Sequence, residues 1–195
     1  YNGEIIIGGV PLNEVNEINL MQRVVLVRHN SYLFKGTVEE NLKMAKPDAT
    51  KEEMEAVLQK VNLLGFLQTQ DGLQTRLLEK ASNLSGGQCQ RLVIARALLR
   101  TDSAVYIFDE AASNIDVESE ELIMNVIHEL AKTKTVLLIS HRLANVVKSD
   151  KIYFLKDGEI KESGKHDELM SQNGAYRHLY ESQMALENYG KGGVA

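Results

Sequence analysis

The sequence lacks the features of a membrane-spanning, disulfide-bonded or nucleic-acid-binding protein. Its single cysteine, Cys89, cannot form a disulfide within the chain, which favours a reducing compartment. The longest unbroken apolar run, Ala104 to Phe108, is too short to cross a bilayer, so any membrane role must come through a partner or through sequence outside this chain. The net charge of −5 differs from the basic footprint of nucleic-acid-binding surfaces, and we expect no nucleic-acid partner.

The hydrophobic pattern predicts an α/β fold. With 195 residues, 44% of them hydrophobic, the chain is long enough for one large domain or two small lobes with a real core. Continuous apolar runs at 104–108 ("AVYIF") and 135–140 ("TVLLIS") predict strands buried on both faces of a parallel sheet, and "VVLV" at 24–27 predicts another short buried strand. An amphipathic segment from about Glu118 to Lys132 predicts a helix between the first two runs.

Helical patterns predominate from Val38 to about Arg100. Thr50 and Glu53 have the spacing of a capping box at a helix start. The apolar residues that follow share one face of that helix: Met54, Val57, Leu58 and Val61. Another helix is expected from about Gln88 to Leu99.

Both ends of the chain carry turn signals. Glu4 to Ile7 predicts a strand followed by a Gly8-Gly9 turn, and Asp157-Gly158 is typical of a type I′ hairpin turn. Two helices are expected after the hairpin, around His166 to Met170 and Tyr176 to Glu187.

The stretch "SGGQ" at 85–88 lies where the helix near Gln88 should start. Glycines let the backbone approach a ligand closely, and a helix N-terminus offers unpaired N–H groups and a positive dipole end. Ser85 adds a hydroxyl donor, so the turn suits a phosphate. An ordinary helix-capping loop is the alternative, and it is the commoner one for an isolated "SGG".

Acids and a histidine follow two of the predicted strands. Asp109 and Glu110 come after "AVYIF", at the carboxyl edge where parallel sheets bind ligands. One such carboxylate can hold a metal-bound water and the other can orient or deprotonate an attacking water; capping of the next turn is the alternative. His141 follows "TVLLIS" and can donate to a phosphate oxygen, although a lone histidine there is more often structural.

In their order and spacing, these motifs resemble the nucleotide-binding domain of the ATP-binding cassette (ABC) transporters. "LSGGQCQR" is similar to the family signature, "AVYIFDE" to the Walker B strand, "SNID" to the D-loop and "ISHR" to the switch histidine. "SYLFKGTVEENL", "TRLLEKASN" and "GKHDELMSQNGAYRHLYESQ" resemble segments of the exporter-type domains. The resemblance extends over essentially the whole chain.

The resemblance implies a RecA-like P-loop NTPase fold, truncated at its N-terminus, with an inserted α-helical signature subdomain. Residues 1–37 would be the remnant of the RecA-like lobe with the Q-loop region, and 38–100 the helical subdomain. Residues 101–188 would complete the RecA-like lobe, and 189–195 would be a flexible tail.

The resemblance also implies ATP hydrolysis with Mg²⁺ at a head-to-tail dimer of two such domains. Asp109 would hold the magnesium, Glu110 would polarise the water and His141 would contact the γ-phosphate. The groups that would reach the nucleotide of the partner domain are Ser85, Gly86, Gly87 and Gln88. Asp116 of the D-loop and His29 are also expected among the nucleotide-binding residues. A transmembrane domain, fused upstream, would place this domain at the cytoplasmic face of the cell membrane and use the cycle for export.

The sequence departs from the family pattern at three loops, one of which is the D-loop, with Asn114-Ile115 where Ala-Leu is commoner. His29 stands where the Q-loop glutamine, which touches the metal and relays the nucleotide state to the membrane domain, is expected. Histidine can still make one hydrogen bond, but its charge and metal preference differ. The X-loop segment lacks its usual glycines and has Leu78, Lys80 and Ala81 instead.

No Walker A loop, G-x-x-x-x-G-K-[ST], is present in the chain. Gly164-Lys165 and Gly190-Lys191 lack the rest of that pattern, so we expect the loop to lie upstream of this sequence. The chain alone should then neither bind ATP in its own site nor hydrolyse it. The Walker B strand should also have lost the strand beside it, leaving a hydrophobic edge and face unpaired.

Two other classes remain open at this point. One is a soluble ABC-type ATPase of the DNA-repair or chromosome type, which the exporter-like segments and the acidic charge disfavour. The other is a module that does not hydrolyse ATP and only pairs with a complete domain.

Overall fold

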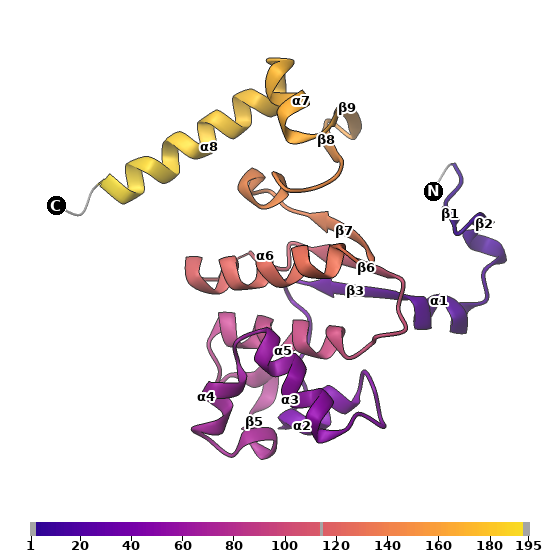
Figure 1. The fold of residues 1–195 in the computed structure, drawn as a ribbon, viewed down its shortest axis with the longest axis vertical. Coiled ribbons are helices and arrows are strands. Elements are labelled where there is room, and N and C mark those ends of the chain that lie inside the picture. Colours follow the sequence, from indigo (N-terminus) through magenta and orange to yellow (C-terminus); the bar gives the residue numbers. More distant parts are fainter. Residues whose placement is uncertain (1–2, 114, 193–195) are drawn as a thin grey trace. The chain divides into compact units, whose positions relative to one another are not determined.

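The computed structural model describes residues 3–113 and 115–192. The chain divides into two units, Tyr1–Ile139 and Ser140–Ala195, and each is described by itself (Figure 1).

Three parallel strands form the sheet of the first unit: β3 (Val24–Arg28), β6 (Val105–Asp109) and β7 (Thr135–Ile139). The predicted parallel strands are confirmed, as is the helix between the last two, α6 (Val117–Ala131). The expectation that the Walker B strand lost a neighbour is wrong. The order is β3-β6-β7, so both edges of β6 already carry hydrogen-bonded ladders, and the free edges among the described residues are those of β3 and β7.

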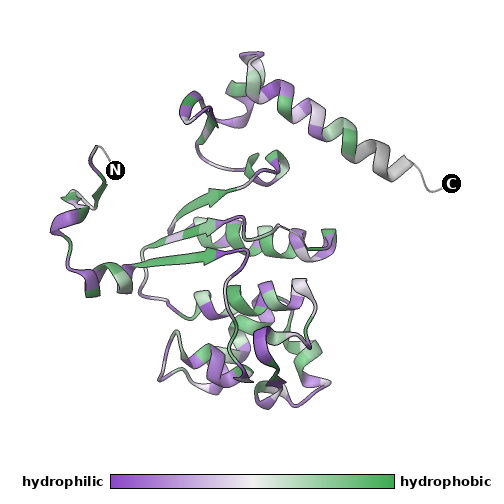
Figure 2. Ribbon diagram, turned by 180° about the vertical axis from the view of Figure 1, so that it is seen from behind, coloured by the Kyte–Doolittle hydropathy of each residue, from purple (hydrophilic) through white to green (hydrophobic). Residues whose placement is uncertain are grey.

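The two faces of this sheet differ in burial, although its strands are hydrophobic along most of their length (Figure 2). Tyr106 and Phe108 lie on the buried face, where α5 contacts β3 and α6 contacts β7. On the other face Leu26, Leu137 and Ile139 are 48%, 51% and 45% exposed. Burial on both faces was therefore a wrong expectation for the described residues, because these helices cover one face only. The expected open hydrophobic face is confirmed.

The segment between β3 and β6 is mainly helical, as predicted. Its elements are β4 (Gly36–Thr37), α2 (Val38–Lys43), α3 (Lys51–Lys60), α4 (Leu64–Gln68), the 3₁₀ turns η2 (Gly72–Gln74) and η3 (Glu79–Ala81), β5 (Arg76–Leu77) and α5 (Gly86–Leu98). The short strands β4 and β5 pair with each other.

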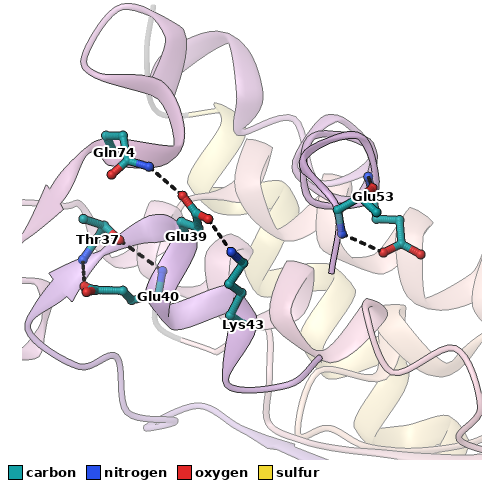
Figure 3. A network of polar contacts seen from close by, with 7 residues as sticks. Thr37, Glu39, Glu40, Lys43, Glu53 and Gln74 are labelled. Carbon is teal, nitrogen blue, oxygen red and sulfur yellow. Dashed lines mark hydrogen bonds and ion pairs between the residues drawn. The ribbon is translucent and has the colours of Figure 1, made fainter. Parts of the chain in front are cut away.

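Three helices of this segment begin with a reciprocal capping box, at Thr37, Thr50 and Ser85. The Thr50 hydroxyl accepts from the N–H of Glu53 at 3.2 Å, and the Glu53 carboxylate accepts from the N–H of Thr50 at 3.0 Å. This confirms the predicted box, and Thr37 makes the same exchange with Glu40 (Figure 3). Each box satisfies two N–H groups that a helix start leaves unpaired.

The apolar face predicted for α3 is buried, and it contributes to one core with the other helices. The side chains with no exposed surface in this segment are Val38, Leu42, Leu58, Leu63, Leu67, Ala81, Leu92, Ile94 and Ala95.

The start of the chain forms a small hairpin, β1 (Ile6–Ile7) with β2 (Val10–Pro11). The predicted glycine turn joins them, and Gly8 and Gly9 have φ values of 60° and 82°, which glycine adopts without strain. A 3₁₀ turn, η1 (Leu12–Glu14), and helix α1 (Glu17–Arg23) lead from the hairpin into β3.

The second unit contains η4 (Leu143–Val146), β8 (Ile152–Lys156), β9 (Glu159–Gly164), α7 (His166–Ser171) and α8 (Ala175–Gly192). Positive φ at both Asp157 and Gly158 confirms the type I′ turn between β8 and β9. The Glu162 carboxylate accepts from the N–H of Ala175 at 2.6 Å and so caps α8. Burial raises the pKa of Tyr176 at the start of α8 to about 12.

Helix α8 also corrects the expected tail. A flexible tail from residue 189 is wrong for 189–192, which continue the helix to Gly192. A formed helix extends at little cost until strong breakers such as consecutive glycines occur, and the first glycine pair here is Gly192-Gly193. Residues 193–195 lie outside the described part.

Candidate functional site

The signature turn is a helix N-terminus whose polar side chains form its own cap. Ser85 is the N-cap of α5; its hydroxyl accepts from the N–H of Gln88 at 3.2 Å, and the Gln88 side chain accepts from the N–H of Ser85 at 2.9 Å. The helix therefore begins at Gly86 and not at Gln88, and both glycines belong to its first turn. Their N–H groups are of the kind that a helix leaves for a ligand, and the Ser85 hydroxyl keeps a proton to donate.

Gly87 has a second reason to be glycine. A Cβ at this position would lie 2.5 Å from the Ser119 hydroxyl and 3.0 Å from a carboxylate oxygen of Asp116. Both residues belong to the start of α6, so the signature turn packs directly against the end of the D-loop segment of the same chain.

Asp116 is the N-cap of α6. Its carboxylate accepts from the N–H of Ser119 at 2.8 Å. The hydrogen bonds from Ser119 are the main cause that holds the pKa of Asp116 below its usual value, and Arg91 adds a smaller attraction. The aspartate is thus fixed as an anion beside Gly87. Asn114, in the same D-loop stretch, lies outside the described residues.

The two acids end β6 in different backbone conformations. Asp109 completes the strand, whereas Glu110 has a φ of 50°, which is unusual for a residue with a side chain. The surroundings hold it there: its N–H donates to the carbonyl of Ile139 at 3.0 Å, and its carbonyl accepts from the Ser113 hydroxyl at 2.8 Å. Strain of this kind, maintained by neighbours, is typical of functional positions.

His29 follows β3 and lies next to the end of β6. Its N–H donates to the carbonyl of Asp109 at 3.1 Å. Arg28 is the register partner of Asp109, and its guanidinium is 3.9 Å from that carboxylate. The buried side chain of Gln90 in α5 donates to the carbonyl of Arg28 at 3.4 Å. The structure therefore brings His29, the strand-end acids and the signature helix together within the first unit.

His141 belongs to the second unit. Its carbonyl accepts from the side chain of Gln183 in α8 at 2.8 Å, and the same side chain accepts from the N–H of Leu143 at 2.9 Å. Gln183 thus fixes the backbone on both sides of Arg142, directly after the histidine.

The donor set at the end of β6 fits magnesium. Asp109 offers a partly exposed carboxylate, and Mg²⁺ is usually bound by one or two carboxylates together with substrate phosphates. Within residues 3–113 and 115–192 no group of three or more His, Cys, Asp or Glu side chains could hold a metal ion. Burial raises the pKa of the Cys89 thiol, which disfavours a thiolate at the helix start.

Sequence reasoning missed three features of this site. The first is the cap of α5: Ser85 and Gln88 have the Ser-x-x-Gln spacing of a capping box, which the pattern alone could have revealed. The other two are the contacts of Gln90 and of Ser119. They depend on how α5 packs on β3 and α6, and no local signal in the sequence identifies them.

A parallel sheet with acids at its carboxyl edge, joined to a helical segment that ends in a glycine turn, defines the ATPase domain of an ABC protein. A family model described as ABC transporter matches residues 1–113, and the chain belongs to this family.

Relatives indicate the exporter branch. An uncharacterized ABC transporter ATP-binding protein of Haemophilus influenzae is 49% identical over 95% of the chain and 33% of that protein. An ATP-dependent lipid A-core flippase of Vibrio vulnificus is 41% identical over 93% of the chain and 31% of that protein. A bacterial Atm1-family ABC exporter, solved with ATP bound, matches 94% of the chain and 32% of its own with a TM-score of 0.86 and 29% identity. A DNA-repair-type ATPase is therefore not favoured.

The chain spans about a third of the length of these relatives. Within the described residues, no helix has the length and apolar character needed to cross a membrane.

Proposed function

We propose that this chain is the greater part of the ATP-binding domain of an ABC exporter, working as one of two domains that enclose ATP head to tail. One observation carries the proposal: the signature turn, Asp116 and the strand-end acids lie in a single packed unit. Placed so, they can present amides to one nucleotide and carboxylates to another. The intact protein would then hydrolyse ATP to drive export.

The proposed roles follow from the chemistry of each group. Asp109 holds the magnesium ion, which, when bound, neutralises charge on the phosphates. Glu110 orients the attacking water from its position directly after β6, where hydrogen bonds of its backbone maintain a φ of 50°. His141 donates to the γ-phosphate, and His29 contributes one hydrogen bond beside Asp109. The signature residues Ser85, Gly86, Gly87 and Gln88, with Asp116, act on the nucleotide held by the partner domain.

This division implies that the chain by itself does not turn over ATP. The phosphate cradle of such a site is a lysine-bearing loop, and the 195 residues contain none. The chain contains the signature turn that would act on the nucleotide of a partner, together with the strand-end acids, but not that lysine-bearing loop.

A groove next to His29 supports a fused transmembrane domain as the second partner, at the cytoplasmic face of the membrane. The groove has a volume of about 290 Å³, and its lining includes Phe34, Met44 and Arg96. Phe34 and Met44 are 47% and 53% exposed, while burial lowers the pKa of the Arg96 guanidinium. Exposed apolar side chains around a partly buried cation are typical of a protein-docking surface.

The substitution Glu110→Gln in the whole transporter tests the proposed hydrolysis. Glutamine keeps the size of the side chain but cannot polarise a water as a carboxylate does, so turnover should fall by about 10²-fold or more while ATP binding is retained. Steady-state ATPase assays and nucleotide-binding measurements check both parts. Glu118→Gln, an exposed change at the start of α6, is the matched control. Normal turnover in Glu110→Gln would remove this residue from the role.

A further inference from the structure

Two buried polar side chains hold the start of α5 in place: Ser119 of α6 packs against it, and Gln90 of α5 bonds to β3. Ser119 is 5% exposed, and its hydroxyl lies against Gly87; Gln90 is also 5% exposed, and it bonds to the carbonyl at the end of β3. The start of α5 is therefore fixed between α6 and β3, without any ligand.

Ser119 holds two candidate nucleotide-binding elements at once. Its N–H donates to Asp116, which keeps the aspartate turned toward α5, and its side chain sets the distance of closest approach of Gly87. A methyl group added at position 87 would clash with Ser119 and crowd Asp116, so the two elements are closely packed at this point. Close-packed contacts of this kind transmit displacement.

We propose that Ser119 is a positioning residue that makes the signature turn and the D-loop aspartate a single rigid body. The second signature glycine is required by this contact within the chain, in addition to any approach of its N–H to phosphate. The consequence for ATP turnover rests on the proposed function, whereas the packing contact does not.

Two explanations for Gly87 make opposite predictions about rescue. If a nucleotide phosphate demands glycine, a methyl group at position 87 is harmful whatever lies on α6. If Ser119 demands glycine, space made at position 119 restores what Gly87→Ala loses. Three variants therefore decide between them: Gly87→Ala, Ser119→Gly and the double variant.

Thermal unfolding of the full 195-residue chain gives the first measurement. Gly87→Ala should lower the midpoint by about 2–10 °C, the usual range for overpacking in a chain of this size. In the Ser119→Gly background, Gly87→Ala should lower the midpoint by at most half as much as it does in the wild type. Ser119→Ala should recover less, because it removes the hydroxyl at 2.5 Å but leaves the Cβ at 3.0 Å. Gly65→Ala, a helical glycine with open space around it, is the control and should not lower the midpoint.

ATP turnover of the whole transporter gives the second measurement. Gly87→Ala should reduce turnover by about tenfold or more, and the double variant should return to within about threefold of Ser119→Gly. Recovered stability without recovered turnover would overturn the positioning role. So would a midpoint loss from Gly87→Ala that is equally large in the wild type and in the Ser119→Gly background. A wild-type transporter without ATPase activity would instead count against the proposed function, and the midpoints would still judge the contact.

Discussion

The helical segment between β3 and β6 and the sheet beside it differ in how much of their apolar side-chain surface they bury. The helices bury most of their apolar side chains, and Leu42, Leu58 and Leu92 have no exposed surface. The sheet does so on one face only, and Leu26 and Leu137 on the other face are about half exposed. Burial of apolar surface is the main source of stability. The helical segment obtains this burial from its own residues, whereas the open face of the sheet could gain further burial by packing against another element.

The largest effect should come from truncating a leucine on each side of this comparison. Leu58→Ala removes a fully buried side chain and should lower the free energy of unfolding by about 2–5 kcal/mol. Leu137→Ala, at a half-exposed position of the sheet, should lower it by less than about 1 kcal/mol. Urea unfolding of the two variants measures both values. Equal losses would mean that the open face is covered in solution, and a dependence on protein concentration would reveal covering by a second copy.

An intermediate effect concerns how the helical segment depends on pH. The bond from Lys46, and then the bond from the Thr50 N–H, hold the pKa of Glu53 below its usual value. A carboxylate whose pKa is lowered by folding stabilises the fold at pH values above its ordinary pKa of 4.5. This stabilisation is lost as the pH falls through the lower pKa of the folded state. Glu53→Gln keeps a cap acceptor but does not titrate, so it should lose less stability than the wild type between neutral pH and pH values below 4.5.

Thermal midpoints across that pH range provide the test, with Glu118→Gln on α6 as the control. If Glu53→Gln and the wild type lose stability in parallel, the capping box does not contribute to acid sensitivity.

The smallest effect should come from the X-loop, where the chain keeps a left-handed backbone without glycine. Lys80 is exposed and has a φ of 55°, a conformation that costs a residue with a side chain about 1–2 kcal/mol. Lys80→Gly relieves this strain but adds about 0.5–1 kcal/mol of backbone entropy, so a net gain of about 0.5 kcal/mol is expected. Lys60→Gly, at a helical position of α3, should destabilise instead. A loss of stability in Lys80→Gly would show that the Lys80 side chain makes a contact worth more than the strain.

The sequence predicts those parts of this molecule that depend on local patterns. The Thr50 box, the Asp157-Gly158 turn and the strand at 105–109 are each set by a few neighbouring residues, and all three are confirmed. The expected loss of a strand beside Walker B was wrong because it rested on a strand order assumed from the family resemblance, whereas β6 lies between β3 and β7. The contact of Gly87 with Ser119 joins residues far apart in the chain, so it becomes visible only when α5 and α6 are packed together.

The open face of the sheet links the covering of apolar surface to the assembly of the site around Asp109. Alternate residues of a strand share a face, so the stripe that includes Leu26 and Leu137 continues, at the end of the strands, into Arg28, Asp109 and Ile139. An element that covers the whole stripe would therefore also lie beside Asp109 and bring its own groups there. Completing the hydrophobic core and assembling the reaction centre would then be the same event, and a domain with an uncovered sheet would be unable to consume ATP before it is whole.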